Sequence, residues 1–140
     1  VFRTSDAFRI EKIFLCGITG TPPHRDIQKT ALGATESVTW EYRENIDELI
    51  QELKLLNIYI ASIEQAENAC FLNAFEIPSE QKLALVFGNE VDGVAQSVVS
   101  ASDTVIEIPQ FGTKHSLNIS VSAGIVIWEI GKQYINSLKQ

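Results

Sequence analysis

The chain has 140 residues, which is enough for one domain with a substantial hydrophobic core. Hydrophobic residues make up 45% and charged residues 21%, a balance that excludes an intrinsically disordered chain. The formal net charge of −7 argues against a strongly basic nucleic-acid-binding protein, although residues 1–30 carry five basic residues against three acidic ones and could form a mildly basic face.

Membrane insertion and secretion are not expected from this sequence. The longest apolar stretch, residues 117–130, is interrupted by polar residues and is too short to span a bilayer. No secretion signal opens the chain. Cys16 and Cys70 stand among apolar neighbours without metal-ligand spacing, so we expect buried thiols in a reducing cytoplasm and no metal site. Because Val1 begins what reads as the middle of an element, we expect a fragment that lacks its N-terminal segment.

The first half of the chain alternates between helical and extended patterns. We expect a helix end at residues 3–10, a strand at 12–18 and a long loop with one helical turn at 19–36. A second strand at 37–42 and an amphipathic helix at 45–56 should follow. Asn45 is a plausible N-cap of the last of these, with Asp47 and Glu48 at its positive end.

The second half continues the alternation and determines the expected fold class. We expect strands at 57–63, 81–88 and 104–109, a short helix at 94–101 and a long helix at 117–138. This order predicts an α/β fold with a mostly parallel sheet covered by helices on both faces. Ligands bind such sheets at the carboxyl ends of the strands, here after Ile60 or Ala61, after Phe87 and after Ile108.

The stretch LVFGNEVDGV, residues 85–94, places a glycine directly after a buried strand. Gly88 would let a ligand approach the backbone closely because no Cβ stands in the way. Asn, Asp and Gly are equally typical of an ordinary β-turn before a helix, so this alternative stays open. The stretch is not a phosphate-binding P-loop, because no Lys-Ser/Thr follows the second glycine.

The stretch IPQFGTKHSLNIS, residues 108–120, leads into the long C-terminal helix. Ser116 or Asn118 could simply cap that helix, or the helix N-terminus with Lys114 nearby could bind an anion. A Ser–His nucleophile pair is a poor interpretation, because His115 and Ser116 are adjacent and their side chains diverge. No role is assigned to His115.

Arg3, in VFRTSDAF, would by itself be an ordinary salt-bridged arginine. Taken together and in order, however, the three stretches resemble the signature motifs of the SpoU (TrmH-like) RNA 2′-O-ribose methyltransferases of the SPOUT superfamily. The segment TPPHRDIQKTALGATESVTW resembles the one that the family carries after its first strand. The asparagine that begins the family's first motif would lie before Val1, which agrees with a fragment.

The resemblance implies a C-terminal deep trefoil knot that holds S-adenosyl-L-methionine, a homodimer, and an RNA substrate, either tRNA or rRNA. It implies a catalytic set of Arg3, Glu90, Ser116 and Asn118, and a cofactor pocket of Ala61, Ser62, Gly88, Ile108 and Leu117. Two other interpretations stay open: a catalytically inactive SpoU-like RNA-binding or dimerisation module, and an unrelated nucleotide-binding α/β enzyme that uses the Gly88 loop for phosphate.

Overall fold

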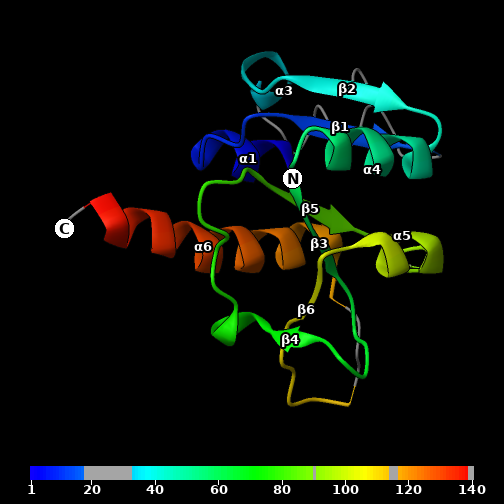
Figure 1. Cartoon of the computed structure of the whole chain (residues 1–140). Helices are drawn as coiled ribbons and strands as arrows, with labels where there is room; N and C mark the ends of the chain where they lie inside the picture. The colour runs from blue at the N-terminus through cyan, green and yellow to red at the C-terminus, as the bar shows by residue number, and fades with distance from the viewer. Residues whose placement is uncertain (18–32, 90, 114–116, 139–140) are drawn as a thin grey trace. The chain divides into compact units, whose positions relative to one another are not determined.

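A computed structural model describes residues 1–17, 33–89, 91–113 and 117–138 (Figure 1). The chain divides into two compact units, Val1–Leu49 and Ile50–Gln140. Each unit contains a parallel sheet, two-stranded in the first and four-stranded in the second. The expected α/β fold with a parallel sheet is therefore confirmed.

The first unit is built on two short strands. Its elements are α1 (Phe2–Ala7), β1 (Ile13–Cys16), α3 (Ala34–Ser37) and β2 (Trp40–Arg43). The two strands pair in parallel, with Ile13 opposite Trp40 and Cys16 opposite Arg43. Phe2, Leu15 and Val38 form its buried core. Both expected strands are confirmed, each shorter than its apolar pattern. The helical turn expected around residues 26–32 lies outside the described residues.

Helix α4 (Ile46–Leu55) begins where the sequence predicts. The Asn45 Oδ1 atom accepts hydrogen bonds from the backbone N–H groups of Asp47 at 2.9 Å and Glu48 at 3.2 Å. Asn45 is thus the N-cap, since it satisfies two of the N–H groups that a helix leaves without an internal partner.

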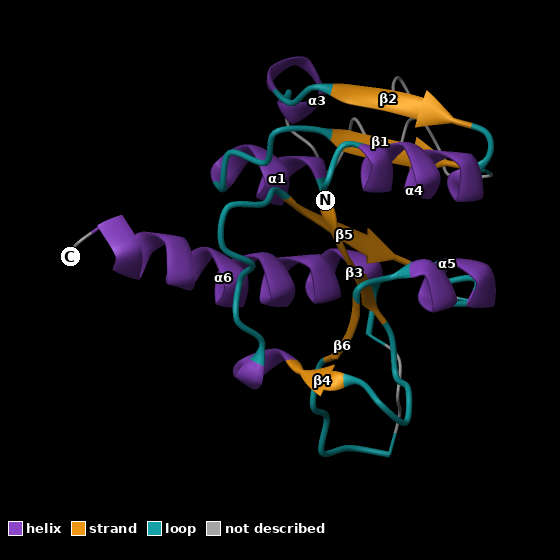
Figure 2. Ribbon diagram, viewed as in Figure 1, coloured by secondary structure: helices purple, strands orange, loops and turns teal. Residues whose placement is uncertain are grey.

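The second unit holds the larger sheet (Figure 2). Its elements are β3 (Tyr59–Ile63), β4 (Cys70–Phe71), the 3₁₀ turn η1 (Leu72–Ala74), β5 (Leu83–Phe87), α5 (Gln96–Ala101), β6 (Thr104–Glu107) and α6 (Ile119–Leu138). The strand order is β4-β6-β3-β5, and every neighbouring pair is parallel. Ile63 of β3 lies opposite both Phe87 of β5 and Ile106 of β6, so these three strands end at the same edge of the sheet.

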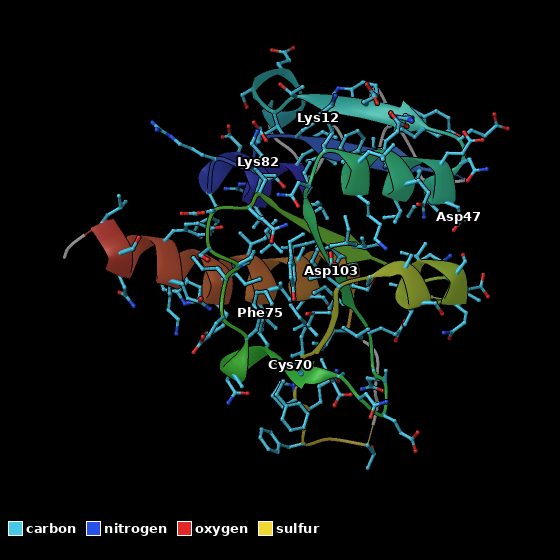
Figure 3. All side chains as sticks on the ribbon, in the orientation of Figure 1. Lys12, Asp47, Cys70, Phe75, Lys82 and Asp103 are labelled. Carbon is cyan, nitrogen blue, oxygen red and sulfur yellow. The ribbon has the colours of Figure 1, made fainter. Side chains whose placement is uncertain are left out.

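Helix α6 packs on this sheet and on the segment after β4. Its Val126 and Ile130 join a buried cluster with Ala61 and Ile106 from the sheet and Phe75 from the segment. Phe75 is labelled in Figure 3. A polar contact reinforces the packing, because the Gln133 side chain accepts a hydrogen bond from Ile77 N–H at 2.9 Å and donates one to Phe75 O at 2.7 Å. Within the described part of the chain, no helix is long and apolar enough to cross a membrane.

Candidate functional site

The common edge of β3, β5 and β6 is the place where a parallel sheet offers a ligand site. The residues that follow these strand ends are Glu64, Gly88 and Ile108. Backbone pairing continues past the end of β3, because Glu64 N–H donates to Ile106 O at 3.0 Å. The sequence predicts ligand positions after Phe87 and after Ile108, and the structure brings the ends of β5 and β6 beside the end of β3.

A tight turn follows β5, and Asn89 organises it. Gly93 N–H donates to Asn89 O at 3.1 Å. The Asn89 side-chain oxygen accepts from Val91 N–H at 2.9 Å and from Asp92 N–H at 2.7 Å. Gly93 adopts φ +67°, a left-handed conformation that glycine takes without strain. The turn alternative for residues 85–94 is therefore confirmed.

Gly88 is required for a reason different from the one expected. A Cβ built on Gly88 would lie 2.0 Å from the carbonyl carbon of Gly93 and 2.3 Å from Val94 N. The space in front of Gly88 is filled by the protein's own backbone, so its missing Cβ allows the turn to close. A contact from the Gly88 backbone to a cofactor stays a prediction.

The turn has few donors left for a phosphate group. The backbone N–H groups of Val91, Asp92 and Gly93 all bond to Asn89, and the next one, Val94 N–H, donates to Glu64 Oε2 at 3.0 Å. A phosphate site on a glycine-rich loop needs such N–H groups free and pointing at the ligand. The interpretation of the Gly88 loop as a nucleotide-phosphate site therefore has no support from the geometry of these residues.

Ala61 and Ser62 lie inside the sheet, both with fully buried side chains. The Ser62 hydroxyl is 2.5 Å from the Ser102 hydroxyl, which donates its own proton to Val98 O at 2.7 Å. Because Ser102 has only one proton to donate, Ser62 is the donor of the pair. The Ser62 side chain is thus committed to the end of α5, and the expected contact of Ala61 and Ser62 with a cofactor stays a prediction.

Asn118 caps helix α6. Its Oδ1 atom accepts a hydrogen bond from Ser120 N–H at 2.7 Å, and its backbone oxygen accepts from Ser122 N–H at 2.9 Å. Of the two capping candidates, the structure supports Asn118. The Asn118 side-chain NH₂ group makes no hydrogen bond to any other residue that the structure describes. Leu117 is 37% exposed, whereas Ile108 is partly buried against the core of the second unit.

The remaining candidates divide between the first unit and the undescribed residues. Arg3 is exposed on α1 and makes no ion pair with any residue of the described ranges, which argues against the ordinary salt-bridged arginine. Glu90 and Ser116 lie outside the described residues, as do Lys114 and His115. Arg3 belongs to the first unit and Asn118 to the second.

Part of the basic face expected near the N-terminus is neutralised. Glu41 accepts from Arg43 at 3.1 Å and from Lys12 at 3.3 Å. These hydrogen bonds, that of Arg43 first and that of Lys12 next, hold the pKa of the Glu41 carboxyl below its usual range. Among residues 1–17 and 33–49, Arg3 and Arg9 are left as exposed cations that do not contact this carboxylate. No group of His, Cys, Asp or Glu that could hold a metal ion occurs in the described part of the chain.

Sequence reasoning missed two acidic residues at opposite edges of the sheet. Glu64 joins the end of β3 to the turn after β5, because its Oε2 atom accepts from Val94 N–H. Asp103 joins the beginnings of β3 and β6, because its Oδ2 atom accepts from Ile60 N–H at 2.8 Å and its N–H donates to Ile60 O at 2.8 Å (Figure 3). An acidic residue directly before or after a predicted strand is the signal that could have indicated them.

The model of the SpoU rRNA Methylase family matches residues 1–128, which include the three motif stretches. The chain belongs to this family. It is 29% identical over 95% of its length to the 23S rRNA (guanosine-2′-O-)-methyltransferase RlmB of Neisseria meningitidis, and covers 52% of that protein. It is 33% identical to an uncharacterized tRNA/rRNA methyltransferase of Borreliella burgdorferi, of which it covers 57%. The chain thus spans about half the length of these relatives.

Solved structures of SpoU proteins share the fold. The TrmH/SpoU tRNA modifying enzyme of A. aeolicus superposes with a TM-score of 0.85 at 26% identity, over 97% of this chain and 68% of that one. The SpoU methyltransferase AviRb of Streptomyces viridochromogenes, in complex with AdoMet, superposes with a TM-score of 0.85 at 19% identity, over 96% of this chain and 51% of that one. The latter likeness concerns the fold alone.

Proposed function

We propose that this SpoU domain transfers a methyl group from S-adenosyl-L-methionine to a ribose 2′-hydroxyl of tRNA or rRNA. The observation that carries the proposal is the family match, which runs continuously through the three motif stretches. Support comes from relatives: one is named as a guanosine-2′-O-methyltransferase, and a SpoU structure of the same fold contains AdoMet.

The chemistry requires positioning more than it requires an unusual side chain. S-adenosyl-L-methionine, when bound, supplies an electrophilic methyl group on a positively charged sulfur. The ribose 2′-oxygen would form the new C–O bond as the S–C bond breaks, S-adenosylhomocysteine would leave as the neutral thioether, and the hydroxyl proton would pass to water. Arg3 suits an RNA phosphate, because its guanidinium stays charged and is exposed without a described partner. Holding ribose and donor in line can supply several kcal/mol of the acceleration, on the order of 7–11 for well-oriented reactants.

Asn118 can serve the helix and the substrate at the same time. Its oxygen is held by Ser120 N–H, which leaves the side-chain NH₂ group to donate to a ribose oxygen. Glu90 and Ser116 complete the proposed catalytic set from the family motifs.

The proposed cofactor pocket fits the common edge of β3, β5 and β6. Ile108 and the exposed Leu117 offer apolar surface for an adenine ring, and Gly88 offers backbone in the turn. Ala61 and Ser62 would contribute through the end of β3. We further propose that the C-terminal part of the chain forms the deep trefoil knot expected of the family.

Helix α6 supports a homodimer. Opposite its buried side, it carries exposed apolar residues at helical spacing, namely Val121, Ile125, Trp128 and Ile135, which are 49%, 39%, 50% and 40% exposed. A helix that is apolar on both sides needs a partner for the second side, and the steps of four, three and seven residues suit a neighbouring helix. We propose that a second copy covers this side, and that the protein works in the cytoplasm.

The test is transfer of a tritium-labelled methyl group from S-adenosyl-L-methionine to unmodified tRNA and rRNA by the full protein. A product that resists alkaline cleavage at the modified nucleotide would identify the 2′-oxygen as the acceptor. Arg3→Ala and Asn118→Ala should abolish turnover, whereas Lys54→Ala, which removes an exposed cation at the end of α4, should not. RNA binding without transfer would instead support the inactive module.

A further inference from the structure

Glu64 occupies the central position at the edge where the methyl donor is proposed to bind. Strand β3 lies between β6 and β5 in the sheet, and Glu64 is the first residue after β3. Its backbone N–H is bonded to Ile106 O of β6 at 3.0 Å, so the residue itself is held in place by the neighbouring strand. Its side chain extends to the other side, toward the turn after β5.

Both carboxylate oxygens of Glu64 accept backbone hydrogen bonds. Oε2 accepts from Val94 N–H at 3.0 Å, and Oε1 accepts from Gln65 N–H at 3.0 Å. The first bond joins the end of β3 to the turn that follows β5, and the second fixes the orientation of the carboxylate. Hydrogen bonds to a charged acceptor are among the stronger ones in proteins.

The fit between this carboxylate and the turn is close. A Cβ built on Gly93 would lie 2.3 Å from Glu64 Oε2, and its next two neighbours would also be atoms of the Glu64 carboxyl group. Gly93 is therefore glycine for two reasons, its positive φ and the approach of Glu64. On the other side of the turn, Gly88 packs directly on the Gly93 backbone.

We propose that Glu64 is a positioning residue for the methyl donor, because its carboxylate sets how closely the turn formed by Gly88 and Asn89 with residues 91–94 lies against the end of β3. This inference rests on the proposed function, since the pocket in question is the proposed cofactor site. Glu64 acts through the turn and not on the reacting atoms. A side-chain oxygen, not a negative charge, is what the Val94 N–H group requires.

The first experiment is calorimetric titration of the full protein with S-adenosyl-L-methionine. Glu64→Ala should raise the Kd about tenfold, because it removes the acceptor of Val94 N–H that holds the turn against the end of β3. Glu64→Gln keeps an oxygen for Val94 N–H and should restore affinity to near that of the unaltered protein. Glu67→Ala removes the same group from an exposed position in the same loop and should leave the Kd unchanged. In methyl transfer, Glu64→Ala should raise KM for the donor more than it lowers kcat.

Unaltered protein that binds no donor at millimolar concentration would overturn the proposed function and, with it, the role of Glu64. Normal binding by the unaltered protein together with normal binding by Glu64→Ala would overturn the role of Glu64 alone. Loss of affinity in Glu64→Gln equal to that in Glu64→Ala would also overturn it, because the hydrogen bond would then not be the cause.

A second experiment needs no ligand. Gly93→Ala should lower the thermal unfolding midpoint of the unaltered protein for two reasons: alanine disfavours the positive φ, and the new methyl group would displace the Glu64 carboxylate from Val94 N–H. The same change in a Glu64→Ala background should lower it less, since only the cost of the positive φ remains. Equal shifts in the two backgrounds would show that Glu64 and Gly93 do not touch, and would overturn the proposal.

Discussion

Replacement of Asn118 separates its contribution to the helix from its proposed contribution to the reaction. Its Oδ1 atom accepts from Ser120 N–H at 2.7 Å, which makes it the N-cap of a 20-residue helix. Asn118→Ala removes this acceptor and should lower the free energy of unfolding by about 1 kcal/mol. Asn118→Asp keeps an acceptor and places a negative charge at the positive end of the helix, so the stability should be unchanged or slightly higher.

Thermal unfolding followed by circular dichroism measures the first effect, with an expected fall in the midpoint of roughly 3–5 °C for Asn118→Ala in a chain of this size. Methyl transfer measures the second effect. Both variants lack the side-chain NH₂ group, so both should lose turnover although only Asn118→Ala loses stability. Equal destabilisation by Asp and Ala would refute the cap, and full turnover by Asn118→Asp would refute the donor role.

Three further predictions test close packing and burial. Gly88→Ala should lower the free energy of unfolding of the second unit by about 1–3 kcal/mol, because its Cβ would meet backbone that cannot move aside. Gly112→Ala is the control, because its Cβ would meet nothing within 4 Å and its free energy of unfolding should be nearly unchanged in the same denaturation series. An unchanged free energy of unfolding in Gly88→Ala would contradict the close contact between Gly88 and the Gly93 backbone. Ser102→Ala should lower the free energy of unfolding by about 1–3 kcal/mol, because it leaves the buried Ser62 hydroxyl without its acceptor. Adding Ser62→Ala to that variant should lower the free energy of unfolding little further. Burial raises the pKa of the Cys16 thiol, so at pH 7.5 its alkylation by iodoacetamide should be slow in the folded protein and faster in denaturant; equal rates would refute that burial.

The regular elements of this protein were predictable because their patterns are local. The apolar runs at 57–63 and 81–88 correspond to β3 and β5, and the signal at Asn45 gave the start of α4 correctly. Strand β4 was missed, because a strand of two residues carries no periodicity and is held by pairing with β6. Helix α3, of four residues, was missed for the same reason.

The family was also available from the sequence, since the three motif stretches and their order lie in the chain itself. The family model confirms this resemblance. The reason for Gly88 was not available, because the sequence could not show whether a ligand or the chain's own backbone fills the space beside it. Likewise, two residues could cap α6, and only the coordinates support Asn118.

Sequence alone determined the alternation of elements, the parallel sheet and the family, because periodicity, turn residues and motif spacing are properties of neighbouring positions. Tertiary structure decided which polar groups meet. The bonds from Ser62 to Ser102 and from Val94 to Glu64 join residues 40 and 30 positions apart. Such pairs form only when the parallel strands align their ends, and a register shift of one residue would point each side chain to the other face of the sheet.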